Sequence, residues 1–308
     1  MLNQRALAYL SEVVRRGSFR RAADHLNIDV SVVSRQIKAL EESLGVALLH
    51  RHSSGVQVTE SGQFLVDHFQ GQMSAEKAVL SKLQKLQGLV SGQVAIAVGE
   101  GFIADLVSEP LESFMTAYPG IELDVTMAGM DEAIDLVTQG HVDFALLYAP
   151  PVDAQLVCHV ETKHPLDLIV PAGHPLMALR RQVFLQDIEG YPLGLMNHPF
   201  GMRHLVNAVA HQERISLRAR LHTNSVAVLR NFVVSGIGVT FMPQLTVIDA
   251  LDDAEIGILE MAHPALNGAT AQIVSRQGRA LTVSAEACLE HLRRGMRFFN
   301  SDAPRLLP

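Results

Sequence analysis

The chain has 308 residues, of which 48% are hydrophobic and 19% are charged. This composition excludes wholesale disorder, and the length leaves room for two or more domains with substantial cores. Apolar runs such as 144–149 are far too short to span a bilayer, and residues 1–5 lead directly into an amphipathic pattern instead of a signal peptide. We therefore expect a globular, cytoplasmic protein with no membrane partner.

Charge is divided unevenly along the chain. The formal net charge is −7, yet residues 1–58 carry eight Lys and Arg against five Asp and Glu, whereas the remainder carries seventeen against twenty-seven. A basic region on an acidic body is typical of a nucleic-acid-binding module joined to a domain of another function, because neutralising phosphates requires Lys and Arg locally.

Neither the cysteines nor the histidines form a recognisable metal motif. Cys158 and Cys288 lie far apart without CxxC spacing, and we expect both to be buried apolar residues. The fourteen histidines contain no HxxH or HExxH pattern. We therefore expect neither a metal site nor a cofactor.

Three short helices are predicted at the amino terminus. Apolar residues recur at helical spacing over 2–14, and a second helix is expected over 19–26. Asp29 or Ser31 can cap a third helix that runs to about residue 43. A tight turn before the last of three short helices is typical of a helix-turn-helix.

The third helix should direct Val33, Ile37 and Leu40 inward, because these residues share one helical face. After it, the polar, basic segment 50–55 and the alternating segment 56–58 indicate a two-stranded wing with a polar tip.

A long helix is predicted to begin after Thr59, a candidate N-cap, and to reach about residue 89 without a proline. At ~1.5 Å per residue its length is roughly 45 Å. Its apolar positions approximate a coiled-coil seam and favour pairing with a second copy, and packing on its own body is the alternative. These positions are Leu65, Phe69, Val79, Leu83, Leu86 and Val90.

Strands and helices alternate in the rest of the chain. Strands are expected at 93–98, 121–126, 144–148, 166–170, 193–196, 217–222, 239–242 and 270–275. Helices are expected at 103–117, 130–139, 202–212, 226–235 and 283–299. This alternation favours parallel sheets built from βαβ units.

Several groups of residues at fixed spacing form a recognisable pattern along the chain. In the amino-terminal region they include Gly17, Ser18, Phe19, Ala22, Ala23, Leu26, Ser34, Arg35, Gln36, Ile37, Leu40, Gly45, Thr59 and Gly62. In the body they are Tyr118-Pro119-Gly120-Ile121, Gly140-His141-Val142-Asp143, His174-Pro175-Leu176 and Gly236-Ile237-Gly238-Val239 followed by Pro243. Together these residues resemble the signature of the LysR-type transcriptional regulator family.

The resemblance implies a fold of the α/β class with an N-terminal winged helix-turn-helix, a long linker helix and two α/β subdomains of periplasmic-binding-protein-like type. The implied boundaries are 1–58 for the DNA-binding domain, 59–91 for the linker and dimerisation helix, and 92–303 for the effector-binding domain, with subdomain I at 92–162 and 270–300 and subdomain II at 166–264.

The resemblance also implies a sequence-specific transcriptional regulator that is not an enzyme. Such a protein forms a homodimer or homotetramer, binds an inverted-repeat operator in double-stranded DNA, and responds to a small organic effector held between the subdomains. Anions are among the candidate effectors, and RNA polymerase is a candidate partner.

The chain departs from the family pattern at three places. Val30 stands where many members have Gln, and Asp29 replaces a Ser or Thr. Val30 can contact a thymine methyl but cannot hydrogen-bond a base edge, so we expect a different operator sequence. Leu49 replaces the usual Phe before the wing, a conservative core change. Segment 99–102 lacks the Ser or Thr that often begins the effector site, which affects the effector's identity more than its location.

The candidate DNA-binding residues lie on the second and third helices and the wing. Arg35 is the first candidate for base reading, since its guanidinium can bind guanine through two hydrogen bonds. Ser31, Val32 and Ser34 are small enough to let the helix enter the major groove deeply, and Val30 begins that helix. Each charged residue could instead be a solvated surface group. The candidate phosphate contacts are Arg20, Arg21, Lys38 and Arg51.

The effector is expected where strands end and helices begin, in the crevice between the subdomains. Phe102, Met196 and Phe200 would form an apolar wall for an organic ligand, although such residues are also common core filler. Glu100 could take a proton or a cationic ligand, and a solvated or salt-bridged Glu is the alternative. The full candidate set is Glu100, Gly101, Phe102, Ile103, Gly129, Tyr148, Met196, Asn197, Phe200, Thr223, Asn224 and Gly238.

Two other functions compete poorly with a regulator. An enzyme would need a catalytic setting, yet the chain has no G-x-S-x-G, no Walker loop and no G-x-G-x-x-G after a strand. A stand-alone solute-binding protein would need an export signal and would not need the basic amino-terminal helices.

Overall fold

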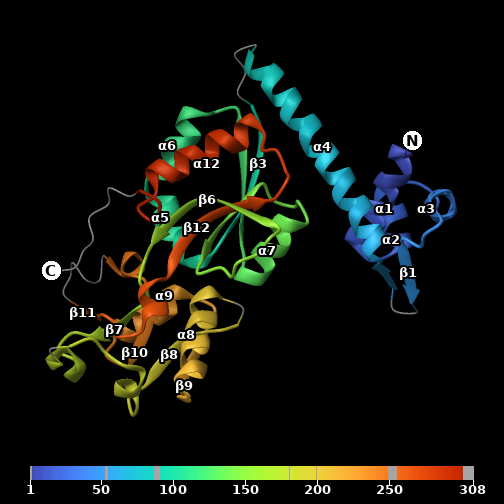
Figure 1. Cartoon of the computed structure of the whole chain (residues 1–308). Coiled ribbons are helices and arrows are strands. Elements are labelled where there is room, and N and C mark those ends of the chain that lie inside the picture. The colour runs from blue at the N-terminus through green and yellow to red at the C-terminus, as the bar shows by residue number, and fades with distance from the viewer. Residues whose placement is uncertain are drawn as a thin grey trace. The chain divides into compact units, whose positions relative to one another are not determined.

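The computed structural model describes residues 2–52, 55–86, 91–179, 181–198, 200–248 and 255–300, without the side chains of 84–86 (Figure 1). The chain forms two compact units. The amino-terminal unit is Met1–Lys82 with Gly278–Thr282, and the carboxy-terminal unit is Leu83–Gln277 with Val283–Pro308.

The amino-terminal unit begins with the three predicted helices, α1 (Gln4–Arg16), α2 (Phe19–Leu26) and α3 (Val30–Leu44). Each ends at a residue in the left-handed backbone region, with φ of 60° at Gly17, 52° at Asn27 and 68° at Gly45. Glycine and asparagine tolerate this region, so the helices end sharply. The tight turn between α2 and α3 follows from this.

The helices share one small apolar core. Ala22 and Ala23 are fully buried and let α2 approach its neighbours closely. The core also contains Leu7, Leu10, Val13, Val33, Ile37, Leu40, Leu48, Leu49 and Val66. The inward orientation predicted for the third helix is therefore confirmed, and Leu49 is a core residue as expected.

The wing consists of β1 (Leu49–His52) and β2 (Gly55–Val58), an antiparallel pair. Residues 53–54 of the predicted tip lie outside the described residues. Helix α4 (Glu60–Leu86) follows, and Thr59 caps it as predicted, since its Oγ1 accepts a hydrogen bond from the Gly62 N–H at 3.0 Å. A Cβ on Gly62 would lie 2.1 Å from the Leu48 carbonyl oxygen, so only glycine fits at this contact.

The apolar residues predicted to form a seam on α4 fall into two groups, one packed against the core and one exposed. Leu65 and Phe69 pack against the amino-terminal core and are not part of an open seam. Further along the helix, Val79 and Leu83 are 58% and 53% exposed, as is the neighbouring Leu80 at 54%. The Leu86 side chain and Val90 lie outside the described residues.

The carboxy-terminal unit contains two five-stranded sheets. The first has the order β4-β3-β5-β12-β6, and the second has the order β11-β7-β10-β8-β9. The strands of the first sheet are β3 (Gly92–Val98), β4 (Ile121–Met127), β5 (Phe144–Tyr148), β6 (Leu156–Lys163) and β12 (Thr270–Arg276). Those of the second are β7 (Asp167–Pro171), β8 (Leu193–Met196), β9 (Ala219–Thr223), β10 (Val239–Met242) and β11 (Ile256–Leu259).

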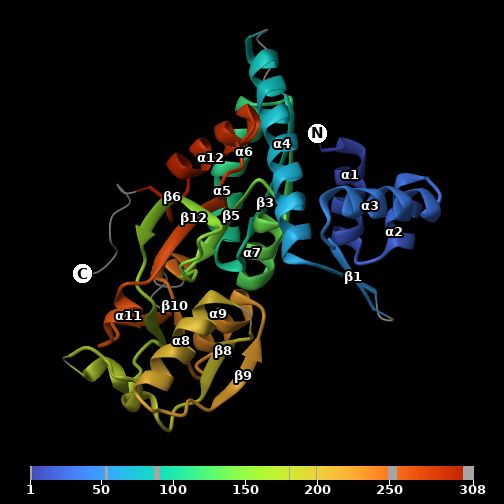
Figure 2. The same ribbon diagram turned by 45° about the vertical axis from the view of Figure 1, so that its right-hand side comes forward.

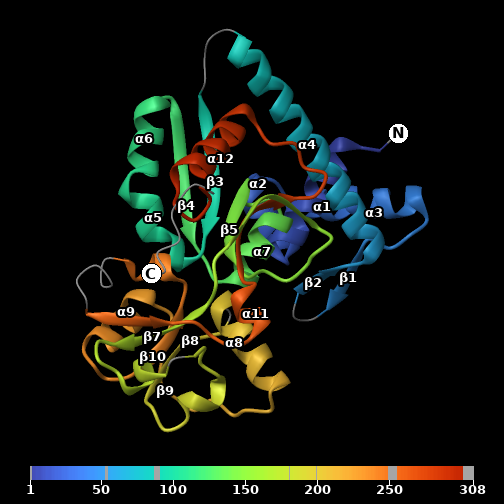
Figure 3. The same ribbon diagram turned by 60° about the vertical axis from the view of Figure 1, so that its left-hand side comes forward.

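We call the parts built on these sheets the first and second lobes. The first lobe has the helices α5 (Ile103–Ser108), α6 (Pro110–Ala117), α7 (Met130–Thr138) and α12 (Val283–Gly295), and Figure 3 shows α5 and α6 one after the other beside its sheet. The second lobe has α8 (Gly201–Gln212), α9 (Val226–Val234) and α11 (Pro264–Asn267), and Figure 2 shows α8 and α9 beside β8.

Strand β5 is buried on both faces, which explains why its sequence predicted a strand. Ala145 and Leu147 pack in a cluster with residues of α7, and Leu146 points to the opposite face because side chains alternate along a strand. Phe144 through Leu147 are all buried. A strand covered on both faces has a continuous apolar sequence, as this one does.

The sheets differ from the prediction in being mixed. β12 is antiparallel to β5 and β6, and β7 is antiparallel to β10 and β11, because the chain crosses between the lobes twice. Strands β6 and β11 were not predicted. β6 lies at a sheet edge and has no fully buried residue, and its sequence LVCHVETK does not alternate between apolar and polar residues as a half-buried strand would. Cys158, on this strand, is exposed and not buried as expected, whereas Cys288 is buried.

The helix predicted over 103–117 is broken into α5 and α6. Pro110 lacks a backbone N–H and restricts the residue before it, and Glu109 accordingly leaves helical geometry with φ of −127°.

Candidate functional site

The outer face of α3 presents the residues that the sequence predicted for DNA recognition. Arg35, Lys38 and Ser31 are exposed, and Val30 at the start of the helix is 39% exposed. Val32 and Ser34 are half-buried, and Arg20 and Arg21 are exposed on α2. Asp29 occupies the N-cap position, but its side chain makes no capping hydrogen bond.

Arg51 connects three elements of this surface. Its guanidinium carbon lies 4.5 Å from the centre of the Phe19 ring on α2, and its Nη2 lies 3.4 Å from the Ser34 Oγ on α3. A guanidinium over an aromatic face is stabilised by cation–π attraction. The wing's arginine is therefore positioned beside α3 while its side chain remains exposed.

Lys38 has a weaker restraint. Its Nζ lies 3.6 Å from Glu42 Oε1, and the side chains are 71% and 66% exposed. Such an exposed ion pair contributes little free energy, so the ammonium remains able to bind a phosphate.

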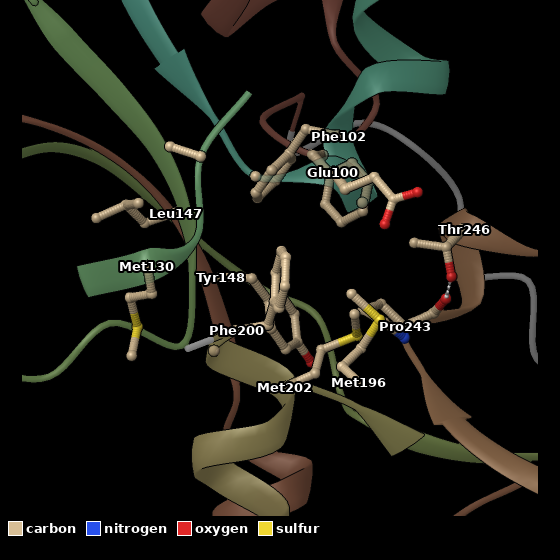
Figure 4. Close-up of a pocket in the computed structure, with 15 residues that line it drawn as sticks. Glu100, Phe102, Met130, Leu147, Tyr148, Met196, Phe200, Met202, Pro243 and Thr246 are labelled. Carbon is tan, nitrogen blue, oxygen red and sulfur yellow. Dashed lines mark hydrogen bonds between the residues drawn. The ribbon is translucent and has the colours of Figure 1, made fainter. Parts of the chain in front are cut away.

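A small cavity lies between the two lobes of the carboxy-terminal unit (Figure 4). The space open to the centre of a water molecule is about 40 Å³. The first lobe contributes Gly99, Glu100, Gly101, Phe102, Ala128, Met130, Leu147, Tyr148 and Phe298, and the second contributes Met196, Phe200, Gly201, Met202, Pro243 and Thr246. Most of these side chains are apolar, so the cavity suits an organic group.

Half of the effector residues predicted from the sequence line this cavity. They are Glu100, Gly101, Phe102, Tyr148, Met196 and Phe200, and the expected apolar wall of Phe102, Met196 and Phe200 is among them.

The other six predicted residues lie away from the cavity lining: Ile103, Gly129, Asn197, Thr223, Asn224 and Gly238. Gly238 is enclosed in the second lobe, where a Cβ would lie 2.1 Å from the Pro192 carbonyl oxygen. Gly129 is buried at the N-cap of α7, whereas Asn197 and Asn224 are exposed. Ile103 is the first residue of α5, and the Thr223 Oγ1 accepts a hydrogen bond from the Ser225 N–H at 3.1 Å.

Sequence reasoning missed two kinds of lining residue. Met130, Met202 and Thr246 follow strand ends, and applying the strand-end rule to every strand would have included them. Phe298 follows no strand, so the strand-end rule does not find it; it reaches the cavity only because the chain after α12 packs against the first lobe. Its N–H donates to Asp105 Oδ2 at 3.0 Å, and its ring centroid lies 4.6 Å from that of Phe102.

Glu100 is neither freely solvated nor paired with a cation. Its Oε1 accepts a hydrogen bond from the Ser225 hydroxyl at 2.9 Å, and its Oε2 accepts one from the Val226 backbone N–H at 2.5 Å. Ser225 is the N-cap of α9 and Val226 is its first residue. The carboxylate thus reaches from the first lobe to the amino end of a helix in the second.

Other polar groups near the cavity already have partners. The Tyr148 hydroxyl donates to the His164 carbonyl oxygen at 2.8 Å, and burial raises the pKa of Tyr148 well above its usual value. Burial also raises the pKa of Asp167, at the start of β7, to about 6, although Gln244 donates a hydrogen bond to it at 3.1 Å. Burial therefore disfavours the ionised form of both groups.

Within the described ranges, no three His, Cys, Asp or Glu side chains gather as metal ligands. No helix in that part of the chain combines the length and apolar character needed to cross a membrane.

Two family models match most of the chain. One, described as the lysR family of bacterial regulatory helix-turn-helix proteins, matches residues 4–63, and the other, described as the LysR substrate binding domain, matches residues 87–297. A probable nitrogen assimilation transcriptional activator of Synechococcus elongatus is 25% identical over 257 residues, which cover 82% of each chain.

Solved structures share the fold. A full-length OxyR variant from Pseudomonas aeruginosa gives a TM-score of 0.69 at 18% identity and covers 99% of both chains. The regulatory domain of Synechocystis CcmR, solved in complex with 2-PG, gives a TM-score of 0.58 at 21% identity and covers 66% of this chain and 96% of that one. The chain therefore belongs to the LysR family of bacterial transcriptional regulators, which join a helix-turn-helix DNA-binding domain to an effector-binding domain and are not enzymes.

Proposed function

We propose that this regulator binds an inverted-repeat operator through α3 and the wing, and that the cavity between the lobes holds its effector. The observation that carries the DNA-binding half is the surface on which Arg35 and Lys38 of α3 stand exposed beside the wing's Arg51. Guanidinium groups can bind guanine edges or phosphates, and an ammonium can bind phosphates.

Residues divide into two roles on the proposed DNA surface. Arg35 is assigned to base edges, and Val30 to a thymine methyl, because its exposed side chain offers only apolar contact. Ser31, Val32 and Ser34 allow close approach. The phosphate contacts are assigned to Arg20, Arg21, Lys38 and Arg51.

The effector is assigned to the cavity because its lining comes from both lobes, so an occupant contacts each of them. A ligand that binds one arrangement of the lobes better than another shifts the population toward that arrangement. The Synechocystis regulatory domain solved with 2-PG supports a small-molecule occupant.

We further assign residues 1–58 to DNA binding, 59–91 to a dimerisation linker and 92–303 to effector binding. The exposed Val79, Leu80 and Leu83 on α4 support pairing with a second copy, and further association of the effector-binding domains would give a tetramer. Light scattering should give a dimer or tetramer mass at micromolar concentration, and a monomer mass would contradict the linker assignment.

Because its target is DNA, we assign the protein to the cytoplasm and name RNA polymerase as a partner in activation.

The experiment that tests the function is fluorescence anisotropy with the DNA upstream of the protein's own gene. It is titrated at several salt concentrations against a scrambled competitor. Tight, selective binding with a steep salt dependence is expected. Weak binding without selectivity would contradict the proposed operator.

A further inference from the structure

Glu100 is the one charged side chain among the described residues that line the cavity. The two hydroxyl-bearing side chains of the lining are already engaged, since Tyr148 donates to His164 and the Thr246 Oγ1 donates to the Pro243 carbonyl oxygen at 2.7 Å. Figure 4 shows the Glu100 carboxylate facing the cavity opposite the sulfur atoms of Met196 and Met202. The described part of the lining therefore presents one negative charge and no cation to an occupant.

The same carboxylate occupies the amino end of α9. The first N–H groups of a helix have no partners within the helix and carry partial positive charge, so they attract anions. In this protein the Val226 N–H and the Ser225 hydroxyl donate to Glu100. Hydrogen bonds to an ionised carboxylate are stronger than those between neutral groups. This contact joins the two lobes across the cavity.

An anionic occupant would meet two obstacles. The carboxylate of Glu100 would repel it in a site of low polarity, and the anion-binding end of α9 is already taken.

The cavity is also small, because about 40 Å³ is much less than the about 150 Å³ of an apolar cavity that holds benzene. A ligand larger than a few heavy atoms therefore requires the cavity to enlarge.

We propose that Glu100 is a built-in carboxylate latch that holds the two lobes together at the amino end of α9, and that the effector is an uncharged organic molecule and not an anion. The proposal rests on the assignment of the cavity as the effector site and specifies the class of its ligand. In this arrangement the protein supplies its own anion, and the effector contributes apolar contacts to Phe102, Met196 and Phe200.

The latch is tested in the full-length protein with Glu100→Ala and Glu100→Gln. Hydrogen exchange of peptides that cover the start of α9 should become about tenfold faster in Glu100→Ala, because charged hydrogen bonds to the helix end are lost. Glu100→Gln keeps one acceptor oxygen, so its exchange rate at the start of α9 should lie between those of the wild type and Glu100→Ala. Glu112→Ala, which removes an exposed carboxylate on α6, is the matched control and should exchange like the wild type.

Propionate and propionamide provide a chemical rescue. Propionate should slow the exchange at α9 and raise the melting temperature of Glu100→Ala, because it restores a carboxylate at the vacated position. Propionamide should do neither, and propionate should leave the wild type unchanged. Unaltered exchange in Glu100→Ala, or equal stabilisation of the wild type by propionate, would overturn the latch.

The ligand class is tested with butyramide and butyrate, which match in size and differ in charge. Butyramide should stabilise the wild type more than butyrate does, and Glu100→Gln should reduce that difference. A wild type that prefers butyrate would overturn the inference. Operator binding is measured in parallel by anisotropy. A protein that binds its operator but fails the tests of Glu100 would contradict the latch alone, whereas loss of selective operator binding would contradict the proposed function.

Discussion

The two proposed binding surfaces are built in opposite ways. The proposed DNA-binding surface is exposed and comes from neighbouring elements between Phe19 and Arg51, whereas the cavity is largely apolar and collects residues from Gly99 to Phe298. A surface made by consecutive elements depends on local caps and helical spacing. A cavity made by distant segments depends on the whole topology. Substitutions should therefore affect the two units separately, and the predictions below test this separation.

The largest effects are expected from closely packed glycines. In Gly62→Ala the new methyl would approach the Leu48 carbonyl oxygen at 2.1 Å, and in Gly201→Ala it would approach the Tyr148 carbonyl oxygen at 2.0 Å. Each substitution should destabilise its own unit by about 3 kcal/mol, since the backbone must shift. Differential scanning calorimetry should show one lowered transition in each variant, the amino-terminal one for Gly62→Ala and the carboxy-terminal one for Gly201→Ala.

Gly71→Ala is the control for these variants. Gly71 lies within α4, and nothing lies within 4 Å of the added Cβ. Alanine should stabilise this helix by up to about 1 kcal/mol. If Gly62→Ala lowered both transitions equally, the units would not be energetically separate.

Arg35→Ala should lower affinity for the operator by roughly 1–3 kcal/mol and relax base preference, because a base contact is lost. Lys38→Ala should weaken binding to operator and scrambled DNA alike and reduce the salt dependence. Competition anisotropy against scrambled DNA measures both. Unchanged discrimination in Arg35→Ala would remove this residue from base reading.

Asp167→Asn should alter the pH dependence of the carboxy-terminal unit. Burial raises the pKa of Asp167 to about 6 from 3.8, so the folded state favours the protonated carboxyl. The stability from this preference is present below about pH 4 and is lost as the pH rises through 6. Asparagine does not ionise, so Asp167→Asn avoids this loss of stability and should stabilise the protein at pH 7 by about 1–2 kcal/mol.

Denaturant unfolding between pH 4 and 7 measures this effect. Asp124→Asn, at an exposed position of β4, is the matched control and should keep the wild-type pH dependence. An Asp167→Asn variant with the same pH dependence as the wild type would show that ionisation of Asp167 does not lower the free energy of unfolding.

The smallest effect is expected from Ser34→Ala. The Ser34 Oγ lies 3.4 Å from the Arg51 Nη2, a long hydrogen bond, and the Phe19 ring still supports the guanidinium without it. Operator affinity should fall by about 0.5 kcal/mol. Ser11→Ala on α1 serves as the control, and a tenfold loss in Ser34→Ala would mean that Ser34 itself contacts DNA.

Sequence reasoning reached further in the amino-terminal unit than in the cavity. The three short helices, the cap at Thr59 and the buried face of α3 follow from local spacing and were predicted. Gly238 does not line the cavity, because the Pro192 carbonyl oxygen and the Phe232 ring enclose it, and Phe298 was missed because Asp105 holds it from another element. Long-range packing of this kind leaves no periodic signal.

The position of β12 also has a consequence for synthesis of the chain. β12 lies between β5 and β6, and Thr270 pairs with Lys163, so the whole second sheet is made before the strand that completes the first. At about 5–20 residues per second, the ribosome needs ~5–20 s to make the roughly one hundred residues between them. During that interval the growing chain carries two unjoined strand edges while a complete neighbouring lobe can already fold.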